Sequence, residues 1–418
     1  MKNLMKRVVL LILVMVLAIP SSTMMAVKAS SKNITIGEYI ELLMKAMKVT
    51  INETENQTYI TAAVSTGVLK TVDEFKVEEE MTRTECAVLT NRADIYVNDN
   101  EVTELNDNIV NFKRISDLSK VTKKYRDDVV QVFGKGIIVG YTNGKYTQDR
   151  EFRGSNKITY AGAKAVIAKL TNTKKRSVMS PDGQLTRTTK LPVNAKEFEY
   201  ILANFPNDFY EMMFYYELPR RSHEPKEMQD YCQPVLMKNY INYDKTVRLY
   251  EWCEVIKENL TYRLNVNYKT LDSEWVRKLN NTFDMDKTKS INDYVKAAKK
   301  NKVIIKVSEI SVEPSTLYLA DGFYCIRVYA KFKVTSASNI KNTLIFGDIY
   351  MPTLKINQWN LGYYDIKLNG KYNGIGYDYK VSSLELYDNW IPIKKKILKP
   401  AFNKKGDEDF PNGYYYFK

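Results

Sequence analysis

Three segments within the first 170 residues open with the same local pattern, and this repetition limits what the region can fold into. They begin at Ile34, Met81 and Ile158, and a threonine follows each of these residues. After Thr35 and Thr82, a glutamate stands three positions later, as in the capping box that satisfies free amides at a helix start. Apolar residues then recur at helical spacing. We therefore predict three related helices whose apolar faces form a core.

A second repeated pattern lies between these helix starts. Residues 60–69 align with residues 129–138, so that Gly67 falls on Gly136 and apolar residues fall on apolar residues. Each copy reads as a short amphipathic helix that ends at a glycine, which permits the left-handed conformation of a helix C-cap. Together the two patterns predict repeated helix–loop–helix units.

The order of these motifs resembles the S-layer homology (SLH) family, whose repeats tether exported bacterial proteins to polymers of the cell wall. Met81-Thr82-Arg83-Thr84-Glu85 is similar to the family's I-T-R-A-E helix start, and Gly140-Tyr141-Thr142-Asn143-Gly144 is similar to its G-Y-x-D-G turn. The resemblance covers residues 33–170 and implies an all-α prism of pseudo-repeated SLH helix–loop–helix units. It also implies a ligand: an anionic secondary cell-wall polymer, pyruvylated or not, or a glycan linked to peptidoglycan.

By the same resemblance, Arg83 contacts the wall glycan through a charge-assisted hydrogen bond. The ligand-binding residues that it implies are Thr82, Arg83 and Glu85 at the helix start and Tyr141, Asn143 and Gly144 in the turn. The residues themselves leave alternatives open. Thr82 and Glu85 also fit a capping box, Arg83 fits a surface ion pair, and Tyr141 fits a packing role. Capping alone does not explain Arg83, because a cation in the first turn opposes the helix dipole.

The repeats depart from the family pattern in ways that limit the number of binding sites. Ile36 and Tyr160 stand where the other two helix starts would carry arginine, and Gly162 replaces the third glutamate. The third repeat has only its opening helix, and residues 97–114, rich in Asn and Asp, read as an insertion. One of three potential sites therefore keeps its cation.

The first 29 residues read as a bacterial signal peptide. A basic start precedes an unbroken apolar run from Val8 to Ile19, and Val27-Lys28-Ala29 offers small residues for cleavage. The run is short for a membrane span, which needs about 20 apolar residues. We expect a secreted protein of the cell wall and envelope surface, with no transmembrane segment after cleavage; an uncleaved anchor is the alternative.

The net charge and the scarcity of histidine limit the classes of function that the chain can perform. The formal net charge of the chain is +14. Four of its lysine and arginine residues, and no acidic residue, lie in the predicted signal peptide. An exported basic chain meets the anionic wall, so we expect no nucleic-acid partner. The single histidine, His223, argues against catalytic triads and most zinc sites. We therefore expect no enzyme, no metal and no cofactor.

The four cysteines show no C-x-x-C spacing, which argues against zinc and thioredoxin-like chemistry. Cys86 falls on the apolar side of a predicted helix and reads as a buried thiol. A disulfide among Cys232, Cys253 and Cys325 stays open.

After residue 170 the composition and the hydrophobic periodicity of the chain change along its length. Residues 171–192 have linker composition, and the aromatic-rich residues 195–217 suggest a helical hairpin. Alternation from Tyr324 to Val334 predicts a half-buried antiparallel strand. Further predicted elements are helices at Val247–Leu260, Leu271–Asn280 and Ile291–Asn301, and hairpin turns at Asn369-Gly370, Asn373-Gly374 and Asn412-Gly413.

We accordingly predict a multidomain chain in which all-α SLH repeats precede an α+β domain with an antiparallel sheet. The predicted segments are a signal peptide at 1–29, SLH repeat 1 with the opening helix of repeat 2 at 33–96, an insertion at 97–114, SLH repeat 2 with the opening helix of a partial third repeat at 115–170, a linker and aromatic-rich connector at 171–234, and an α+β domain of unknown function at 235–418. The expected function is non-covalent anchoring to the wall polymer, with the last domain displayed. Alternatives are a wall-anchored glycan or peptidoglycan hydrolase with paired carboxylates, and a structural S-layer subunit.

Overall fold

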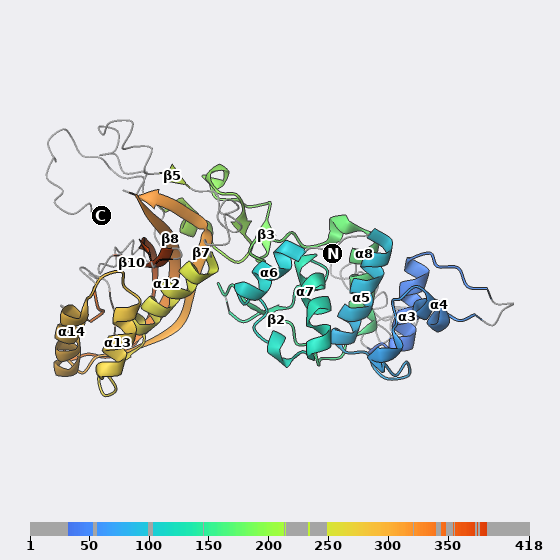
Figure 1. The fold of residues 1–418 in the computed structure, drawn as a ribbon, viewed down its shortest axis with the longest axis horizontal. Coiled ribbons are helices and arrows are strands. Elements are labelled where there is room, and N and C mark those ends of the chain that lie inside the picture. The colour runs from blue at the N-terminus through green and yellow to red at the C-terminus, as the bar shows by residue number, and fades with distance from the viewer. Residues whose placement is uncertain are drawn as a thin grey trace, which may run out of the picture. The chain divides into compact units, whose positions relative to one another are not determined.

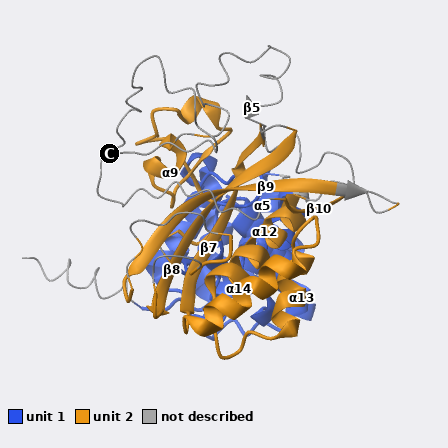
Figure 2. Cartoon of the chain, turned by 90° about the vertical axis from the view of Figure 1, so that its left-hand side faces the viewer, with its two compact units in different colours: residues 1–143, 149–184 blue, residues 144–148, 185–418 orange. Residues whose placement is uncertain are grey.

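The chain forms two compact units in a computed structural model (Figure 1). Unit 1 comprises residues 1–143 and 149–184, and unit 2 comprises residues 144–148 and 185–418 (Figure 2). The structure describes residues 32–52, 57–98, 103–144, 146–212, 214, 233–234, 249–320, 322–339, 344–347, 354, 356–372, 374 and 377–382. The predicted signal peptide and His223 lie outside these residues. Within them, every helix is too short or too polar to cross a membrane.

Unit 1 is built mainly from helices, as the periodicity predicts. Its elements are α3 (Ile36–Ala46), α4 (Tyr59–Ser65), α5 (Arg83–Asn98), α6 (Thr103–Asn111), α7 (Arg126–Gly134), the hairpin of β1 (Tyr141–Thr142) and β2 (Arg150–Glu151), and α8 (Tyr160–Thr171). The three predicted related helices are α3, α5 and α8. The insertion at 97–114 contains the end of α5 and all of α6.

The predicted helix caps are confirmed. Thr35 and Glu38 exchange the two hydrogen bonds of a capping box at the start of α3. Thr82 and Glu85 make the same pair of bonds at the start of α5. The side chain of Thr159 accepts a hydrogen bond from the backbone N–H of Gly162 at the start of α8.

The glycines that follow α4 and α7 have positive φ angles, as the aligned repeat predicts. Gly67 has φ 75° and Gly136 has φ 68°. Their surroundings differ: a Cβ on Gly67 would meet no atom within 4 Å, whereas a Cβ on Gly136 would lie 1.9 Å from the carbonyl oxygen of Ser177.

The residues just before α3, α5 and α8 form a closed ring of backbone hydrogen bonds. Ile34 N–H donates to Ile158 C=O at 3.1 Å, Ile158 N–H donates to Met81 C=O at 3.0 Å, and Met81 N–H donates to Ile34 C=O at 2.9 Å. All three side chains are buried in the core of unit 1. The three helix starts are therefore equivalent in space as well as in sequence, and each depends on the other two.

The segment 171–184, expected as part of a linker, packs onto unit 1. The Nε of Arg114 donates to the backbone oxygen of Asp182 at 2.9 Å, and the two side chains form a buried ion pair. Arg176 and Lys135 both pair with the buried carboxylate of Asp94, the latter at 2.9 Å. The chain therefore leaves unit 1 at residue 184, later than the end of the repeats.

Unit 2 combines helices with an antiparallel sheet, which confirms the predicted α+β composition. The sheet runs in the order β10-β9-β8-β7-β5, and β6 also pairs with β7. Its strands are β5 (Gln233–Pro234), β6 (Val266–Asn267), β7 (Ile304–Ala320), β8 (Phe323–Ser336), β9 (Trp359–Tyr372) and β10 (Tyr377–Val381). β8 covers the predicted strand and buries Val328, Ala330 and Phe332 on one face.

Three helices lie on that face of the sheet (Figure 2). They are α12 (Leu249–Leu264), α13 (Ser273–Asn281) and α14 (Thr288–Lys300), close to the predicted ranges. α12 packs against β7 and β10. Cys253 on α12 and Cys325 on β8 are buried and form no disulfide, and the same holds for Cys86 in unit 1. Cys232 lies outside the described residues.

Short aromatic-rich elements cover part of the opposite face, where the sequence suggested a helical hairpin. β3 (Thr186–Arg187) pairs with β4 (Ile201–Leu202), and α9 (Asn207–Glu211) begins after Pro206. The residue before a proline avoids the helical region, so a continuous helix through Phe205 is disfavoured. Rings from this segment pack with rings of the sheet and with Tyr146 of the 144–148 segment in one core cluster.

Arg327 on β8 lies at the centre of this covered region and is fully buried. Its guanidinium donates to both carboxylate oxygens of Asp365 on β9, at 2.7 Å and 2.9 Å. It also donates to the backbone oxygens of Phe209 and Met212, and it lies over the ring of Phe214. These contacts neutralise the buried guanidinium charge of Arg327 and give a hydrogen-bond acceptor to each of its three nitrogen atoms.

The predicted turn at Asn369-Gly370 is wrong. Both residues lie inside β9, where Asn369 pairs with Lys380 and Gly370 with Tyr379 of β10. Cross-strand pairing extends β9 past a dipeptide that favours turns in isolation. Gly374, with φ 96°, lies between β9 and β10, whereas Asn373 and Asn412-Gly413 lie outside the described residues.

Candidate functional site

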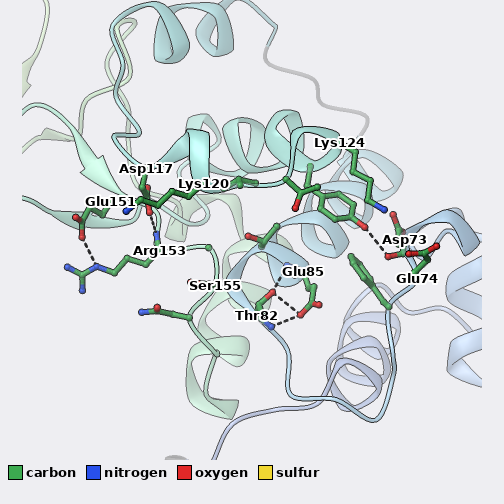
Figure 3. Close-up of a pocket in the computed structure, with 17 residues that line it drawn as sticks. Asp73, Glu74, Thr82, Glu85, Asp117, Lys120, Lys124, Glu151, Arg153 and Ser155 are labelled. Carbon is green, nitrogen blue, oxygen red and sulfur yellow. Dashed lines mark hydrogen bonds and ion pairs between the residues drawn. The ribbon is translucent and has the colours of Figure 1, made fainter.

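A groove of about 580 Å³ opens in unit 1 beside the start of α5 (Figure 3). Four stretches of chain supply its walls: the loop after α4, the first turn of α5, the segment that leads into α7, and the loop before α8. The lining residues are Asp73, Glu74, Phe75, Thr82, Thr84, Glu85, Asp117, Lys120, Val121, Thr122, Lys124, Tyr125, Glu151, Arg153, Gly154, Ser155 and Asn156.

The loop before α8 is fixed to the first turn of α5 by backbone hydrogen bonds. Arg83 N–H donates to Asn156 C=O at 2.8 Å, and Thr84 N–H donates to Gly154 C=O at 3.0 Å. A Cβ on Gly154 would lie 2.4 Å from Oγ1 of Thr84, so glycine permits this close approach. The same kind of bond joins Ile36 N–H to Glu79 C=O at the start of α3. The groove is thus built on the repeated helix start.

Asp117 shapes the wall that carries Arg153. Its two carboxylate oxygens accept hydrogen bonds from the backbone N–H groups of Phe152 and Arg153, at 2.6 Å and 2.8 Å. Arg153 adopts φ 56°, a conformation that is uncommon for a residue with a side chain. Its Nε donates to Glu151 at 2.9 Å along the groove wall.

Asp73 lies at the other end of the groove, and its carboxylate pairs with Arg92, which is outside the groove lining. Arg92 forms a bidentate ion pair with its carboxylate, and the hydroxyl of Tyr125 donates to its backbone oxygen at 3.0 Å. Burial alone would raise the pKa of Asp73, but the hydrogen bonds from Arg92 and from the Lys70 amide hold that pKa below its usual value. Asp73 is therefore an ionised structural group.

Three cations face the groove: Lys120, Lys124 and Arg153 (Figure 3). Nζ of Lys124 donates to the backbone oxygen of Val72 at 3.0 Å, and Arg153 pairs with Glu151. Lys120 is exposed, and no ion pair holds it within the described part of the chain. Five carboxylates also line the groove, and four of them accept hydrogen bonds from the protein, which leaves the Lys120 ammonium as the cation most open to an anionic ligand.

The groove also carries groups suited to a sugar. Thr122, Ser155 and Asn156 offer hydroxyl and amide groups that can donate and accept hydrogen bonds. The rings of Phe75 and Tyr125 lie 5.6 Å apart at one wall. A polyhydroxylated ligand fits this mixture better than a purely apolar one.

The structure separates the residues that the resemblance brought together. Thr82 and Glu85 line the groove, but their side chains hydrogen-bond to each other in the capping box. Arg83 does not line it. Nε of Arg83 donates to Phe152 C=O at 2.9 Å, and its guanidinium lies 4.9 Å from the centroid of the Tyr141 ring.

The three turn residues also lie away from the groove lining. Tyr141 lies against two guanidiniums, because Arg153 stands 4.5 Å from its ring centroid. Asn143 donates from Nδ2 to the hydroxyl of Ser116 at 3.1 Å, and Gly144 belongs to unit 2. Tyr141 therefore connects the Arg83 position to the groove residue Arg153.

The sequence reasoning missed Lys120, Lys124 and Arg153. The first two belong to a run of cations that is visible between Lys120 and Arg126. Arg153 carries no local signal, because it reaches the groove through contacts with Asp117, which lies 36 residues earlier in the chain. The family motif drew attention to the helix start, whereas the cations that line the groove lie on the loops around it.

The described residues contain no group of three or more His, Cys, Asp or Glu side chains placed to hold a metal ion. Searches against protein-family models and curated proteins give no match for this chain.

Proposed function

We propose that unit 1 is a degenerate SLH-type module that holds an exported protein on an anionic secondary polymer of the cell wall. The observation that carries this proposal is the ring of three equivalent helix starts, with the groove beside the one start that matches the family motif. The other two starts carry Ile36, which is buried, and Tyr160 in place of arginine. Binding at a single groove follows from that difference.

In this proposal the polymer is held mainly by Lys120, Lys124 and Arg153, with the hydroxyl and amide groups of the loop before α8 contacting sugar hydroxyls. Arg83 acts as a positioning residue, because its contacts lead through Tyr141 to Arg153. Exposed charges are screened by salt, so affinity for the wall falls as ionic strength rises. Unit 2 is the displayed module.

Co-sedimentation with purified wall sacculi tests the proposal. We expect the protein to pellet with intact sacculi and to stay in solution with sacculi stripped of secondary polymers by hydrofluoric acid. Equal pelleting on both preparations, or pelleting on neither, would overturn it.

A charge-matched pair of variants locates the site. The double variant Lys120→Gln/Arg153→Gln should weaken pelleting by about tenfold, on the scale of two solvent-exposed charge contacts. The control Lys174→Gln/Lys175→Gln removes the same charge from exposed lysines outside the groove lining, and should pellet normally. If Arg83→Ala pellets as well as the unmodified protein, Arg83 has no role in binding, and the proposal for the groove itself is not affected.

A further inference from the structure

The excess positive charge of the chain lies in unit 2. Unit 2 carries 37 Lys and Arg residues and 28 Asp and Glu residues, a formal charge of +9. Unit 1, counted from residue 30, carries 22 and 21, a formal charge of +1. The unit proposed as the anchor is thus nearly neutral, and the basic character of the protein needs a separate explanation.

Part of that charge gathers on the sheet face opposite the helices. The aromatic elements cover this face around Tyr329 and Tyr363, but the strands continue past them (strands labelled in Figure 2). In the next positions β8 places Lys331 and Lys333, β7 places Glu309 opposite Lys331 and Lys306 opposite Lys333, and β9 places Trp359. We call Lys306, Lys331, Lys333 and Trp359 the Lys-Trp patch.

The register of the sheet sets two of these lysines against each other. Lys306 on β7 pairs directly with Lys333 on β8. Like charges that stand directly opposite across strands are destabilising. Glu309, which stands opposite Lys331, accepts a hydrogen bond from the N–H of Tyr146 at 3.0 Å, and no ion pair of the three lysines occurs among the described residues. The Lys306–Lys333 pair therefore keeps a local repulsion that an anion bound between the two ammonium groups would relieve.

Trp359 adds an aromatic surface at the same place. Its side chain is 48 % exposed, although tryptophan is usually well buried. Nζ of Lys331 and Nζ of Lys333 lie 5.2 Å and 4.8 Å from the centroid of its ring. An anionic group near the exposed part of the indole would thus meet both ammonium groups at once.

We propose that the Lys-Trp patch binds a polyanionic polysaccharide, with a sugar ring stacked on Trp359 and its carboxylate or phosphate held by Lys306, Lys331 and Lys333. A sugar ring presents apolar C–H groups to an aromatic face, while its charged substituent reaches sideways to the lysines. This site lies in unit 2 and uses none of the groove residues. It therefore goes beyond the proposed function and stands without it.

Affinity electrophoresis of the purified protein through gels that contain polygalacturonate tests the patch. We expect retardation by this polymer, which carries a carboxylate on each sugar ring, and little retardation by neutral dextran or by polyglutamate, which lacks sugar rings. Trp359→Ala should weaken the apparent affinity about fivefold, as for loss of one aromatic contact. Trp359→Phe should recover part of the loss.

The lysines are tested against a control with the same net charge. Lys331→Gln/Lys333→Gln should weaken binding to polygalacturonate, and Lys299→Gln/Lys300→Gln on the exposed end of α14 should not. Equal weakening by both double variants would show that charge alone drives binding, and would overturn the patch. Normal binding by Trp359→Ala, or equal retention by polyglutamate, would overturn the stacked sugar.

The groove variant Lys120→Gln/Arg153→Gln separates this proposal from the previous one. We expect it to bind polygalacturonate with normal affinity while it loses pelleting with sacculi. If it loses polygalacturonate binding and the patch variants do not, the polysaccharide site lies in unit 1 and the patch is excluded. Thermal unfolding of each variant checks that the fold is retained.

Discussion

Units 1 and 2 are stabilised and charged in different ways. Unit 1 assembles short, repeated helices around three helix starts that hydrogen-bond in a ring, and its formal charge is close to neutral. Unit 2 is built on long antiparallel strands that bury Arg327, and it holds most of the net charge. A binding role in unit 1 therefore depends on a shaped polar groove, whereas one in unit 2 depends on charge and an exposed aromatic ring.

The largest effect that we expect comes from the glycines of the two repeats. Gly136→Ala places a Cβ 1.9 Å from a backbone oxygen at a positive φ, so it should lower the free energy of unfolding by at least about 4 kcal/mol. Gly67→Ala at φ 75° meets no neighbouring atom and should cost only about 1 kcal/mol. Calorimetry should show the change in the transition of unit 1. Equal costs would mean that the two repeats are packed alike.

Arg327→Met should be the most damaging of these changes to unit 2. It removes the cation that pairs with Asp365 and leaves two backbone oxygens without their donor, so we expect a loss of about 3 kcal/mol or more. Urea unfolding followed by a probe in unit 2 measures it. Arg277→Met on α13 removes a guanidinium from an exposed pair with Glu274 and should cost less than about 1 kcal/mol. A loss of similar size in both variants would contradict the buried pair.

A smaller effect tests the repeated helix starts. Thr35→Ala removes the side-chain acceptor for Glu38 N–H and should cost about 1 kcal/mol in unit 1. Thr159→Ala at the equivalent start of α8 should cost a similar amount, because its hydroxyl accepts from Gly162 N–H. Unequal costs, measured in the same urea titration, would break the equivalence of the three starts.

The smallest effect concerns pH. Burial raises the pKa of Asp128, although Nδ2 of Asn91 donates to its carboxylate at 2.9 Å. A carboxyl group with a raised folded-state pKa binds its proton more readily when folded, so stability rises as pH falls through that pKa. Asp128→Asn should therefore raise the unfolding midpoint at pH 7 and lose this advantage in acid. Asp127→Asn, an exposed neighbour in the same first turn of α7, controls for the helix dipole.

The parts that the sequence predicted are those set by local chemistry. Thr35 and Glu38 cap α3 because their spacing alone brings them together, and Gly136 ends its repeat because the backbone there needs a positive φ. The α+β composition of unit 2 followed from periodicity in the same way. Asn369-Gly370 failed as a turn because pairing with β10 outweighed its local preference.

The candidate sites were less accessible from sequence because they are made by tertiary contacts. Arg153 reaches the groove through Asp117, and Trp359 meets Lys331 and Lys333 only through the register of β8 and β9. A family motif can mark the helix start, but it does not show that Arg83 lies against Tyr141 and outside the groove lining.

The ring of helix starts has a consequence for the order in which unit 1 can form. Its bonds join residues 34, 81 and 158, so the N–H of Ile34 lacks its acceptor, and the C=O of Met81 its donor, until the last helix start has been made. Contacts between residues so far apart in sequence slow folding, because a long loop must close before they form. A nascent chain that has left the ribosome only as far as α7 can form the bond between Met81 and Ile34. It cannot yet form the two bonds to Ile158. Unit 1 becomes a closed structure only when its last repeat arrives.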